Sequence, residues 1–242
     1  MNELRTAFDE RLYEVEEYLA FLSALEQVVS EGTPRIGSTV VTVEQQRILY
    51  SGVFLQLYNL VEATVNRCVN AIAEAAASGE KWTPGDLSDQ VRKEWVRFTA
   101  RTHIDLNYHH RLEAAINLCD RLIQVLPVSH FAIQVGGGGN WDENEIETIS
   151  TRLGFELQIS SDVYSRIKRH FRNENGALAS IKYYRNSLAH GSLSFAECGD
   201  GLTVRELIDL KDATANYLRE VVLSFESAID RYEFLLPERR PV

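Results

Sequence analysis

Apolar residues recur at intervals of three, four and seven positions through most of the sequence, with polar residues between them. That spacing places the apolar side chains on one face of an α-helix and predicts amphipathic helices. The stripe from Phe54 to Ile72 covers so much of the circumference that its helix should be central in the fold. The pattern predicts core helices at about 3–30, 42–78, 104–126, 177–190 and 203–235.

The ends of these helices carry local signals. Thr42 with Gln45, and Thr203 with Glu206, have the spacing of a capping box, in which two side chains bond to free backbone N–H groups at a helix start. The five prolines are separated by long tracts without proline, a residue that is poorly tolerated inside helices. A shorter helix is expected after Pro84.

The section at about 127–172 is less regular and is expected to be an insert. Its pattern predicts a loop at Gly136–Gly139, followed by a short helix that is capped by Asn140 and Glu143 and stops at Gly154. A strand or extended connector at 155–159 and a helix at 161–172 are expected to follow. The whole pattern predicts an all-α, mostly antiparallel helical bundle, as a single domain over residues 1–242 with this inserted middle section.

Composition narrows the class of protein. The 242 residues are 45% hydrophobic and 25% charged, which is ordinary for a globular protein. The N-terminus is charged throughout, unlike a signal peptide, and no apolar run approaches the roughly 20 residues of a membrane helix. The three cysteines, Cys68, Cys119 and Cys198, form no CxxC pair, so we expect neither a disulfide framework nor a zinc ribbon, and the cytoplasm is the simplest location.

The formal net charge is −10, from 25 Lys+Arg against 35 Asp+Glu. This balance argues against a protein that coats nucleic acid non-specifically, because such binding depends on neutralising phosphates. It remains compatible with a small basic site, and one short run is basic: Arg166, Lys168, Arg169, His170 and Arg172. Taken alone, this run is more simply explained as a solvated helix face.

Two further patterns have simpler explanations than a ligand site. The run Gly136–Gly139 could suggest a phosphate cradle, but no Lys-Ser/Thr follows it and no clear strand–turn–helix unit surrounds it, so a flexible loop tip is preferred. His103, Asp105, His109 and His110 are close in sequence but lack the HExxH or facial-triad spacing of metal sites. No metal and no cofactor are expected.

The densest chemistry lies in the string KYYRNSLAHG, residues 182–191. On a helix, Asn186 and His190 are four positions apart and share a face, so the amide could orient the imidazole. Gly191 is well placed as the residue after the helix, which would put His190 at the helix end. The residues alone leave open a simpler explanation, a final helical turn whose cation is stabilised by the helix dipole.

The element RNSLAH, residues 185–190, is an Arg-x4-His sequence with Asn directly after Arg. It resembles the signature of the HEPN superfamily (higher eukaryotes and prokaryotes nucleotide-binding domains). The strings YNLVEATV, GNWDENEIETISTRLGF and LAHGSLSFAECGDGLTVRELIDLKDATANYL are similar to other parts of a prokaryotic single-domain HEPN family, whereas residues 80–130 resemble it least. The resemblance implies a HEPN-type helical bundle and a metal-independent endoribonuclease, in which the 2′-hydroxyl of the RNA attacks the adjacent phosphate and leaves a 2′,3′-cyclic phosphate.

The residues of the motif suit that reaction. His190 is the candidate acid or base, because histidine exchanges a proton near neutral pH. Arg185 can hold a phosphate with two parallel hydrogen bonds and stabilise the charge that builds in the transition state. Asn186 can orient His190 or hold a ribose oxygen. Glu62, in the apolar second helix, is an edge residue, a partner for a nearby arginine, or a carboxylate that orients the cationic site.

Two side chains five positions apart on an ideal helix point about 140° apart. Arg185 and His190 of one continuous helix therefore converge poorly on one phosphate, unless the helix loosens at His190 or two chains each contribute a motif. HEPN nucleases commonly build one composite site per dimer, so the resemblance implies a homodimer with both motifs facing a shared cleft.

The expected RNA contacts outside the motif are basic residues near it: Lys182, Arg166, Lys168, Arg169 and Arg172. Tyr183 and Tyr184 could stack on bases, although core packing is expected for at least one of them. The family implies a role in phage defence or a toxin–antitoxin pair, with an antitoxin or companion protein as partner and no membrane. The alternative is a non-catalytic HEPN module that binds RNA, a nucleotide or a partner protein.

Overall fold

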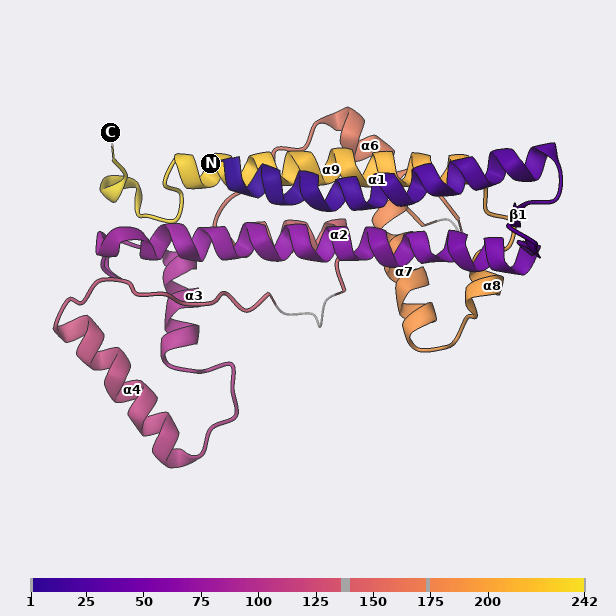
Figure 1. Cartoon of the computed structure of the whole chain (residues 1–242). Coiled ribbons are helices and arrows are strands. Elements are labelled where there is room, and N and C mark those ends of the chain that lie inside the picture. Colours follow the sequence, from indigo (N-terminus) through magenta and orange to yellow (C-terminus); the bar gives the residue numbers. More distant parts are fainter. Residues whose placement is uncertain (1, 136–139, 173–174, 242) are drawn as a thin grey trace. The chain divides into compact units, whose positions relative to one another are not determined.

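A computed structural model describes residues 2–135, 140–172 and 175–241 (Figure 1). The regular structure of the described residues is almost all helical, so the predicted all-α class is confirmed. The α-helices are α1 (Asn2–Glu31), α2 (Val43–Ala77), α3 (Asp89–Thr99), α4 (Tyr108–Ile123), α5 (Glu143–Leu153), α6 (Ser161–Lys168), α7 (Ala177–Ala189), α8 (Phe195–Cys198) and α9 (Val204–Asp230). A small antiparallel hairpin, β1 (Arg35–Ile36) and β2 (Thr39–Val40), joins α1 to α2.

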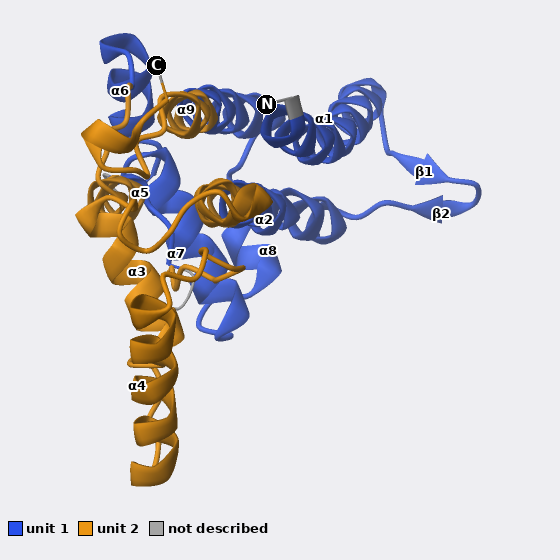
Figure 2. Cartoon of the chain, turned by 90° about the vertical axis from the view of Figure 1, so that its left-hand side faces the viewer, with its two compact units in different colours: residues 1–64, 140–143, 159–220 blue, residues 65–139, 144–158, 221–242 orange. Residues whose placement is uncertain are grey.

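The chain divides into two compact units, each built from segments that are distant in sequence (Figure 2). Unit 1 contains Met1–Thr64, Asn140–Glu143 and Ile159–Glu220. Unit 2 contains Val65–Gly139, Asn144–Gln158 and Val221–Val242. The long helices α2 and α9 therefore each contribute residues to both units.

In unit 1, α1 and the first part of α2 run antiparallel. The Tyr18 hydroxyl donates a hydrogen bond to the Leu49 carbonyl at 2.8 Å, and Arg11 donates to the Asn59 side chain at 3.4 Å. The later residue on α1 contacts the earlier residue on α2, so the two helices run in opposite directions. Apolar residues of the predicted stripes, among them Phe8, Leu12, Val15, Leu19 and Leu22, are buried.

The first part of α9 also lies antiparallel to α1. Lys211 pairs with Glu16 at 3.4 Å, and the backbone N–H of Val204 donates to the Glu26 carboxylate at 3.3 Å. Helix α7 packs on α2 through aromatic side chains, since the rings of Tyr184 and Phe54 lie 4.5 Å apart. Of the two tyrosines that could stack on bases, Tyr184 is therefore a core residue, whereas Tyr183 is exposed.

Unit 2 is organised around α3 and α5. Glu94 on α3 is buried, and its carboxylate pairs with Arg97 at 2.6 Å and with Arg152 of α5 at 3.2 Å. The ring of Phe155 meets that of Phe225 edge to face, with ring centres 4.8 Å apart. One buried carboxylate and an aromatic pair thus join three segments of the unit.

Asp86 joins the turn before α3 to the chain after α9. Its carboxylate accepts hydrogen bonds from the backbone N–H and the hydroxyl of Thr83, at 2.8 and 2.7 Å, and pairs with Arg239 at 3.2 Å. Burial raises the pKa of Asp86, but the two hydrogen bonds and the guanidinium outweigh it, so the pKa lies below its ordinary value. Asp86 therefore stabilises the folded protein in its charged form.

We expect Asp86→Asn to lower the free energy of unfolding at pH 7 by about 1–2 kcal/mol, since it weakens two hydrogen bonds and removes the charge. A lowered pKa contributes stability above about pH 4, and this contribution is lost as the pH falls through the lowered value. Urea unfolding followed by circular dichroism should show a gap between the variant and the wild type that shrinks below pH 4. A gap of equal size at pH 3 and pH 7 would contradict this role.

Several predicted boundaries differ from the structure. The helix predicted at 104–126 is shorter, because the Asn107 side chain caps it by accepting from the backbone N–H of His110. Within α4, Ala114 is the one buried residue, so the prediction of a core helix there is wrong, and Leu112, Ile116 and Ile123 are exposed. The helix predicted at 161–172 ends at Lys168, since Arg169 has extended backbone angles.

Other differences are smaller. The helix predicted at 203–235 ends at Asp230, ahead of a turn in which Tyr232 has a positive φ of 53°. Residues 155–159 form the extended connector rather than the strand. The hairpin and α8 were not predicted, and the loop predicted at Gly136–Gly139 lies outside the described residues.

Helix α2 also meets the length and composition of a membrane-crossing segment, over Val43–Glu80. However, 56% of its most apolar window is buried within the protein. A core helix is apolar for the same reason as a membrane helix, because its surroundings are apolar, so this composition by itself does not indicate a membrane.

Candidate active site

The end of α7 is formed by a glycine-terminated cap. Gly191 has a φ of +68°, a left-handed conformation that glycine adopts without steric cost. The backbone N–H of Ser192 donates to the Ser187 carbonyl at 3.0 Å, and that of Gly191 donates to Leu188 at 3.2 Å. This is the hydrogen-bond pattern of a Schellman motif. His190 is consequently the C-cap residue, directly after the last helical residue Ala189, so it lies at the helix end as predicted, and its side chain is exposed.

We expect Gly191→Ala to destabilise the protein by about 1 kcal/mol, because a Cβ at this positive φ is strained even though no other atom lies within 4 Å of it. Gly191→Asn should cost less, since asparagine tolerates the left-handed conformation better. Chemical denaturation of the three proteins tests this order. Equal stability of the wild type and Gly191→Ala would mean that the cap does not hold the end of α7.

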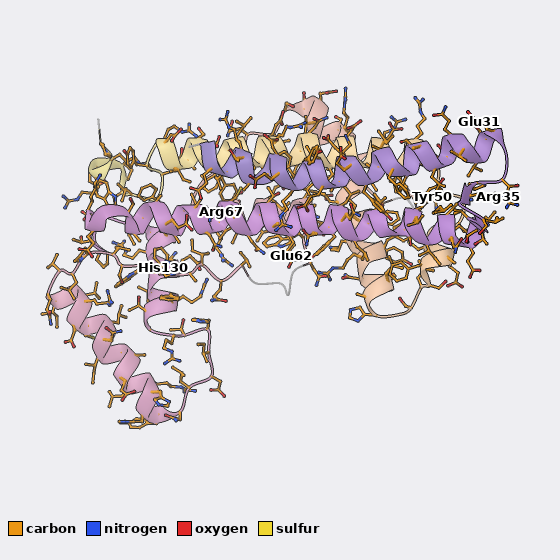
Figure 3. All side chains as sticks on the ribbon, viewed as in Figure 1. Glu31, Arg35, Tyr50, Glu62, Arg67 and His130 are labelled. Atoms are coloured by element: carbon orange, nitrogen blue, oxygen red, sulfur yellow. The ribbon has the colours of Figure 1, made fainter. Side chains whose placement is uncertain are left out.

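Arg185 is held against α2. Its guanidinium carbon lies 3.8 Å from the centre of the Tyr58 ring, and its Nη2 lies 3.8 Å from a Glu62 carboxylate oxygen. Tyr58 and Glu62 are four residues apart, so they share one face of α2 (Glu62 is labelled in Figure 3). Glu62 is thus the partner of a nearby arginine, which was one of its predicted roles, and it is partly exposed.

Asn186 does not contact His190. Its Oδ1 accepts a hydrogen bond from Arg185 at 2.6 Å, and its Nδ2 donates to the Oδ1 of Asn140 at 2.9 Å. Both ends of the amide are therefore bound, and the predicted orientation of His190 by Asn186 is not what the structure has. The His190 side chain makes no hydrogen bond or ion pair with any residue that the structure describes.

The two charged groups of the motif have different surroundings. Arg185 is mostly covered, with a side chain that is 24% exposed, and it lies against Tyr58 and Glu62 of α2. His190 is exposed at the C-terminal end of α7. Since α7 stays regular through Ala189, the divergence of about 140° expected from helix geometry applies to this pair.

Lys182 lies one turn before Arg185 and forms an ion pair with Asp142. Lys168 pairs in the same way with Glu143, at 2.7 Å. Both lysines that were predicted to contact RNA are therefore bound to carboxylates, one just before α5 and one at its first residue. Their charges are largely balanced within the protein.

The remaining basic residues do not form one track. Arg172 donates to the backbone carbonyls of Asp200 and Gly201, at 3.1 and 2.7 Å, and so fastens the loop before α9. Arg166 pairs with Asp162 of its own helix at 3.1 Å. The run therefore separates into residues that bind the protein itself and residues that face solvent.

Arg166, Arg169 and His170 line an open groove of about 590 Å³ in unit 1. Carboxylates of α9, namely Glu206, Asp209 and Asp212, line the same groove. An RNA phosphate in this groove would meet negative charge as well as positive charge. The groove therefore does not favour the RNA backbone track that the sequence predicts there.

Tyr58 is one residue of this site that the sequence analysis did not identify. Burial raises its pKa most, and Glu62 raises it further, while the Trp141 backbone N–H, Arg185 and Lys182 lower it, so the net pKa is above its ordinary value. The hydroxyl therefore stays protonated at neutral pH. Its position one turn before Glu62 was the only feature of the sequence that pointed to a role in the site. An aromatic residue in an apolar helix stripe is more simply predicted to be a core residue.

Asn140 and Asp142 were also missed as site residues, although Asn140 was predicted as a cap. Nothing local in the string NWDE shows that it meets α7. Among the described residues there is no group of three or more His, Cys, Asp or Glu side chains arranged to hold a metal ion. His109 instead lies 3.4 Å from Glu113 on the surface of α4.

A comparison with family models matches residues 1–234 to the HEPN_MAE_28990-like HEPN family. Searches of curated proteins and of solved structures gave no match. The family match covers almost the whole chain, including the Arg-x4-His element and both helices that surround Arg185. On this basis the chain belongs to the HEPN superfamily, within the HEPN_MAE_28990-like HEPN family.

Proposed function

We propose that this protein is a metal-independent endoribonuclease that cleaves RNA through attack of a 2′-hydroxyl on the adjacent phosphate. The new bond joins the 2′-oxygen to phosphorus, the bond to the 5′-oxygen breaks, and the products are a 2′,3′-cyclic phosphate and a 5′-hydroxyl. A proton must leave the 2′-oxygen and a proton must reach the 5′-oxygen. His190 is the group we assign to one of these transfers.

Membership of the HEPN superfamily supports the coarser statement that the protein is a ribonuclease or a nucleotide-binding module. The observation that supports RNA cleavage is the exposure of His190 at the end of α7. Its side chain has no hydrogen-bond or ion-pair partner among the described residues. A histidine that stabilised the fold would be buried or paired. The imidazole of His190 is instead accessible to a substrate.

Arg185 supplies the positive charge. Its guanidinium is supported by the Tyr58 ring and by Glu62, which lie on one face of α2. A supported guanidinium is already ordered when the phosphorane-like transition state forms, so its stabilisation costs little reorganisation. The site needs no metal for this role, because arginine is always charged.

We further propose that the active form is a homodimer with one composite site. Within one chain, Arg185 faces α2 while His190 ends α7, and residues five apart on a helix diverge by about 140°. A two-fold axis near the two α7 ends would bring Arg185 of one subunit toward His190 of the other.

The direct test is cleavage of a structured RNA by the purified protein in EDTA. We expect fragments that end in a 2′,3′-cyclic phosphate, and no cleavage of the same RNA made with 2′-O-methyl groups. Loss of cleavage in Arg185→Ala and His190→Ala supports the assignment. Cleavage of the 2′-O-methyl RNA would exclude attack by the 2′-hydroxyl. Cleavage by both variants at the rate of the wild type would exclude this site.

The second candidate, a HEPN module that binds phosphate groups without cleaving, gives a different result in the same experiment. RNA would then be retained by the wild type in a filter-binding assay and recovered intact. Binding should weaken as salt is raised, because each neutralised phosphate releases counterions. Such a result would overturn the nuclease proposal.

For the biological role, we propose a cytoplasmic toxin or effector of bacterial defence that is restrained by an antitoxin or companion protein. The support is the family resemblance and the cost of an unrestrained ribonuclease to its own cell. Expression of the wild type should arrest growth, and His190→Ala should relieve the arrest. Normal growth at equal expression of both proteins would contradict a toxic activity.

A further inference from the structure

Each of four consecutive residues, Asn140–Glu143, makes a polar contact with α2, α6 or α7. Asn140 accepts the hydrogen bond from Asn186, and the backbone N–H of Trp141 donates to the Tyr58 hydroxyl at 3.4 Å. Asp142 pairs with Lys182 and Glu143 with Lys168. We call this segment the strap; all of these residues belong to unit 1.

The register of the strap on α7 is regular. Asn140 and Asp142 are two positions apart in a non-helical stretch and contact Asn186 and Lys182, which are four positions apart on α7. Two residues of extended chain span about 6.8 Å, and four residues of α-helix span about 6 Å. The strap therefore lies along α7 in the opposite direction, with alternate side chains reaching it.

The strap is anchored rather than loosely attached. Trp141 is 4% exposed and Glu143 is 5% exposed, and Glu143 begins α5, whose residues Ile146 and Ile149 are buried. A segment with a buried indole in its middle cannot leave α7 without exposing a large apolar side chain to water. Its contacts are consequently permanent parts of the folded unit.

The strap reaches Arg185 by two routes. Asn186 accepts from Arg185 at 2.6 Å while it donates to Asn140, so Asn140 sets the orientation of the amide that Arg185 binds. The Tyr58 ring carries the guanidinium at 3.8 Å, and the hydroxyl of the same ring is bound by the strap backbone. Two of the groups that contact the guanidinium, Asn186 and the Tyr58 ring, are therefore themselves bound by the strap.

We propose that Asn140 and Asp142 are positioning residues of the active site, which act on RNA cleavage through Arg185 and Asn186 without touching the substrate. This inference rests on the proposed ribonuclease function. It assigns Lys182 to the strap, as the partner of Asp142, and not to the RNA backbone.

The first experiment exchanges the charges of the ion pair. Asp142→Asn and Lys182→Met should each lower kcat on the order of 10-fold with little change in KM, because a small misplacement of a catalytic group slows the chemical step. The double variant Asp142→Lys with Lys182→Asp should recover most of kcat. If Lys182 instead contacts RNA, the double variant will stay impaired and its KM will rise, and that result would overturn the proposal.

The second experiment does not depend on activity. The rate at which phenylglyoxal modifies Arg185, measured by peptide mass spectrometry, should rise several-fold in Asn140→Ala and Asp142→Asn. Glu16→Gln is the matched control, because it removes a partly exposed carboxylate that pairs with Lys211 in the same unit. Its modification rate at Arg185 should equal that of the wild type.

Melting temperatures of all variants show whether a change in activity or in Arg185 modification comes from unfolding of the protein instead of from displacement of Arg185. If Asn140→Ala and Asp142→Asn leave the modification of Arg185 unchanged, the strap does not position it and the proposal fails. If the wild type does not cleave RNA, the ribonuclease proposal fails. The rate of Arg185 modification still shows whether the strap positions this side chain. The two failures are thus distinguishable.

Discussion

Replacing His190 with alanine should lower the rate of RNA cleavage by on the order of 10²- to 10⁴-fold, which is the usual contribution of a positioned acid or base. The loss should appear without loss of stability, because the side chain is exposed and makes no hydrogen bond or ion pair with the described residues. Single-turnover cleavage and a melting temperature, measured on the same preparation, test both halves of this expectation.

His130→Ala is the matched control, since His130 is also exposed and lies in unit 2 (Figure 3). Its cleavage rate should equal that of the wild type. A His190→Ala protein that cleaves at the wild-type rate, or one that loses activity only by unfolding, would remove His190 from the mechanism.

The composite site makes the His190 experiment sharper. Arg185→Ala and His190→Ala should each be inactive alone, yet mixed dimers of the two variants should regain part of the activity. In a mixed dimer, one subunit still offers His190 and the other still offers Arg185. If the mixture stays inactive although subunits exchange, one Arg185 and one His190 from different subunits do not suffice for a site, and that form of the composite site is excluded.

The second large effect concerns stability. We expect Gly199→Ala to lower the free energy of unfolding by about 3 kcal/mol or more, at the upper end for overpacked sites. A Cβ at Gly199 would lie 1.9 Å from the backbone carbonyl oxygen of Arg47, a contact that no rotamer change can relieve. The end of α8 would have to move away from α2, and the ion pair between Arg47 and Asp200 at 2.6 Å would be disturbed.

Gly37→Ala controls for the general effect of adding a methyl group. Gly37 has a φ of +60°, but nothing lies within 4 Å of a Cβ there, so only the backbone strain of about 1 kcal/mol is expected. Urea unfolding followed by circular dichroism should show the larger loss for Gly199→Ala. Equal losses in the two variants would refute the close approach of α8 to α2.

The starts of α2 and α9 were predictable from the sequence because their signals are local. Thr42 and Gln45 exchange hydrogen bonds of 2.8 and 3.2 Å at the start of α2. Thr203 and Glu206 exchange bonds of 2.9 and 3.2 Å before α9. Residues three apart meet at any helix start, whatever lies around them, so the spacing alone was sufficient.

Helix ends and core membership were less predictable, because they depend on distant residues. The apolar stripe of α4 has helical spacing, but Leu112, Ile116 and Ile123 are exposed, since a stripe shows which residues share a face and not what covers that face. Helix α6 stops before Arg172, whose guanidinium binds carbonyls of residues 200 and 201. No pattern near α6 reports that contact.

The sequence by itself determined the all-α class, the chain of helices with their caps, the family signature, and the placement of His190 at the end of α7 beside Gly191. Each of these depends on residues within a few positions of one another, where helix geometry alone relates them. Only the tertiary structure decided the surroundings of Arg185. Tyr58 and Glu62 belong to α2, Asn140 to the strap and Arg185 to α7, and packing of these distant segments brings them together. Tertiary structure also divided the basic run, because Glu143 binds its lysine and carboxylates of α9 line the same groove as Arg166 and Arg169. A sequence shows charges without showing which of them meet.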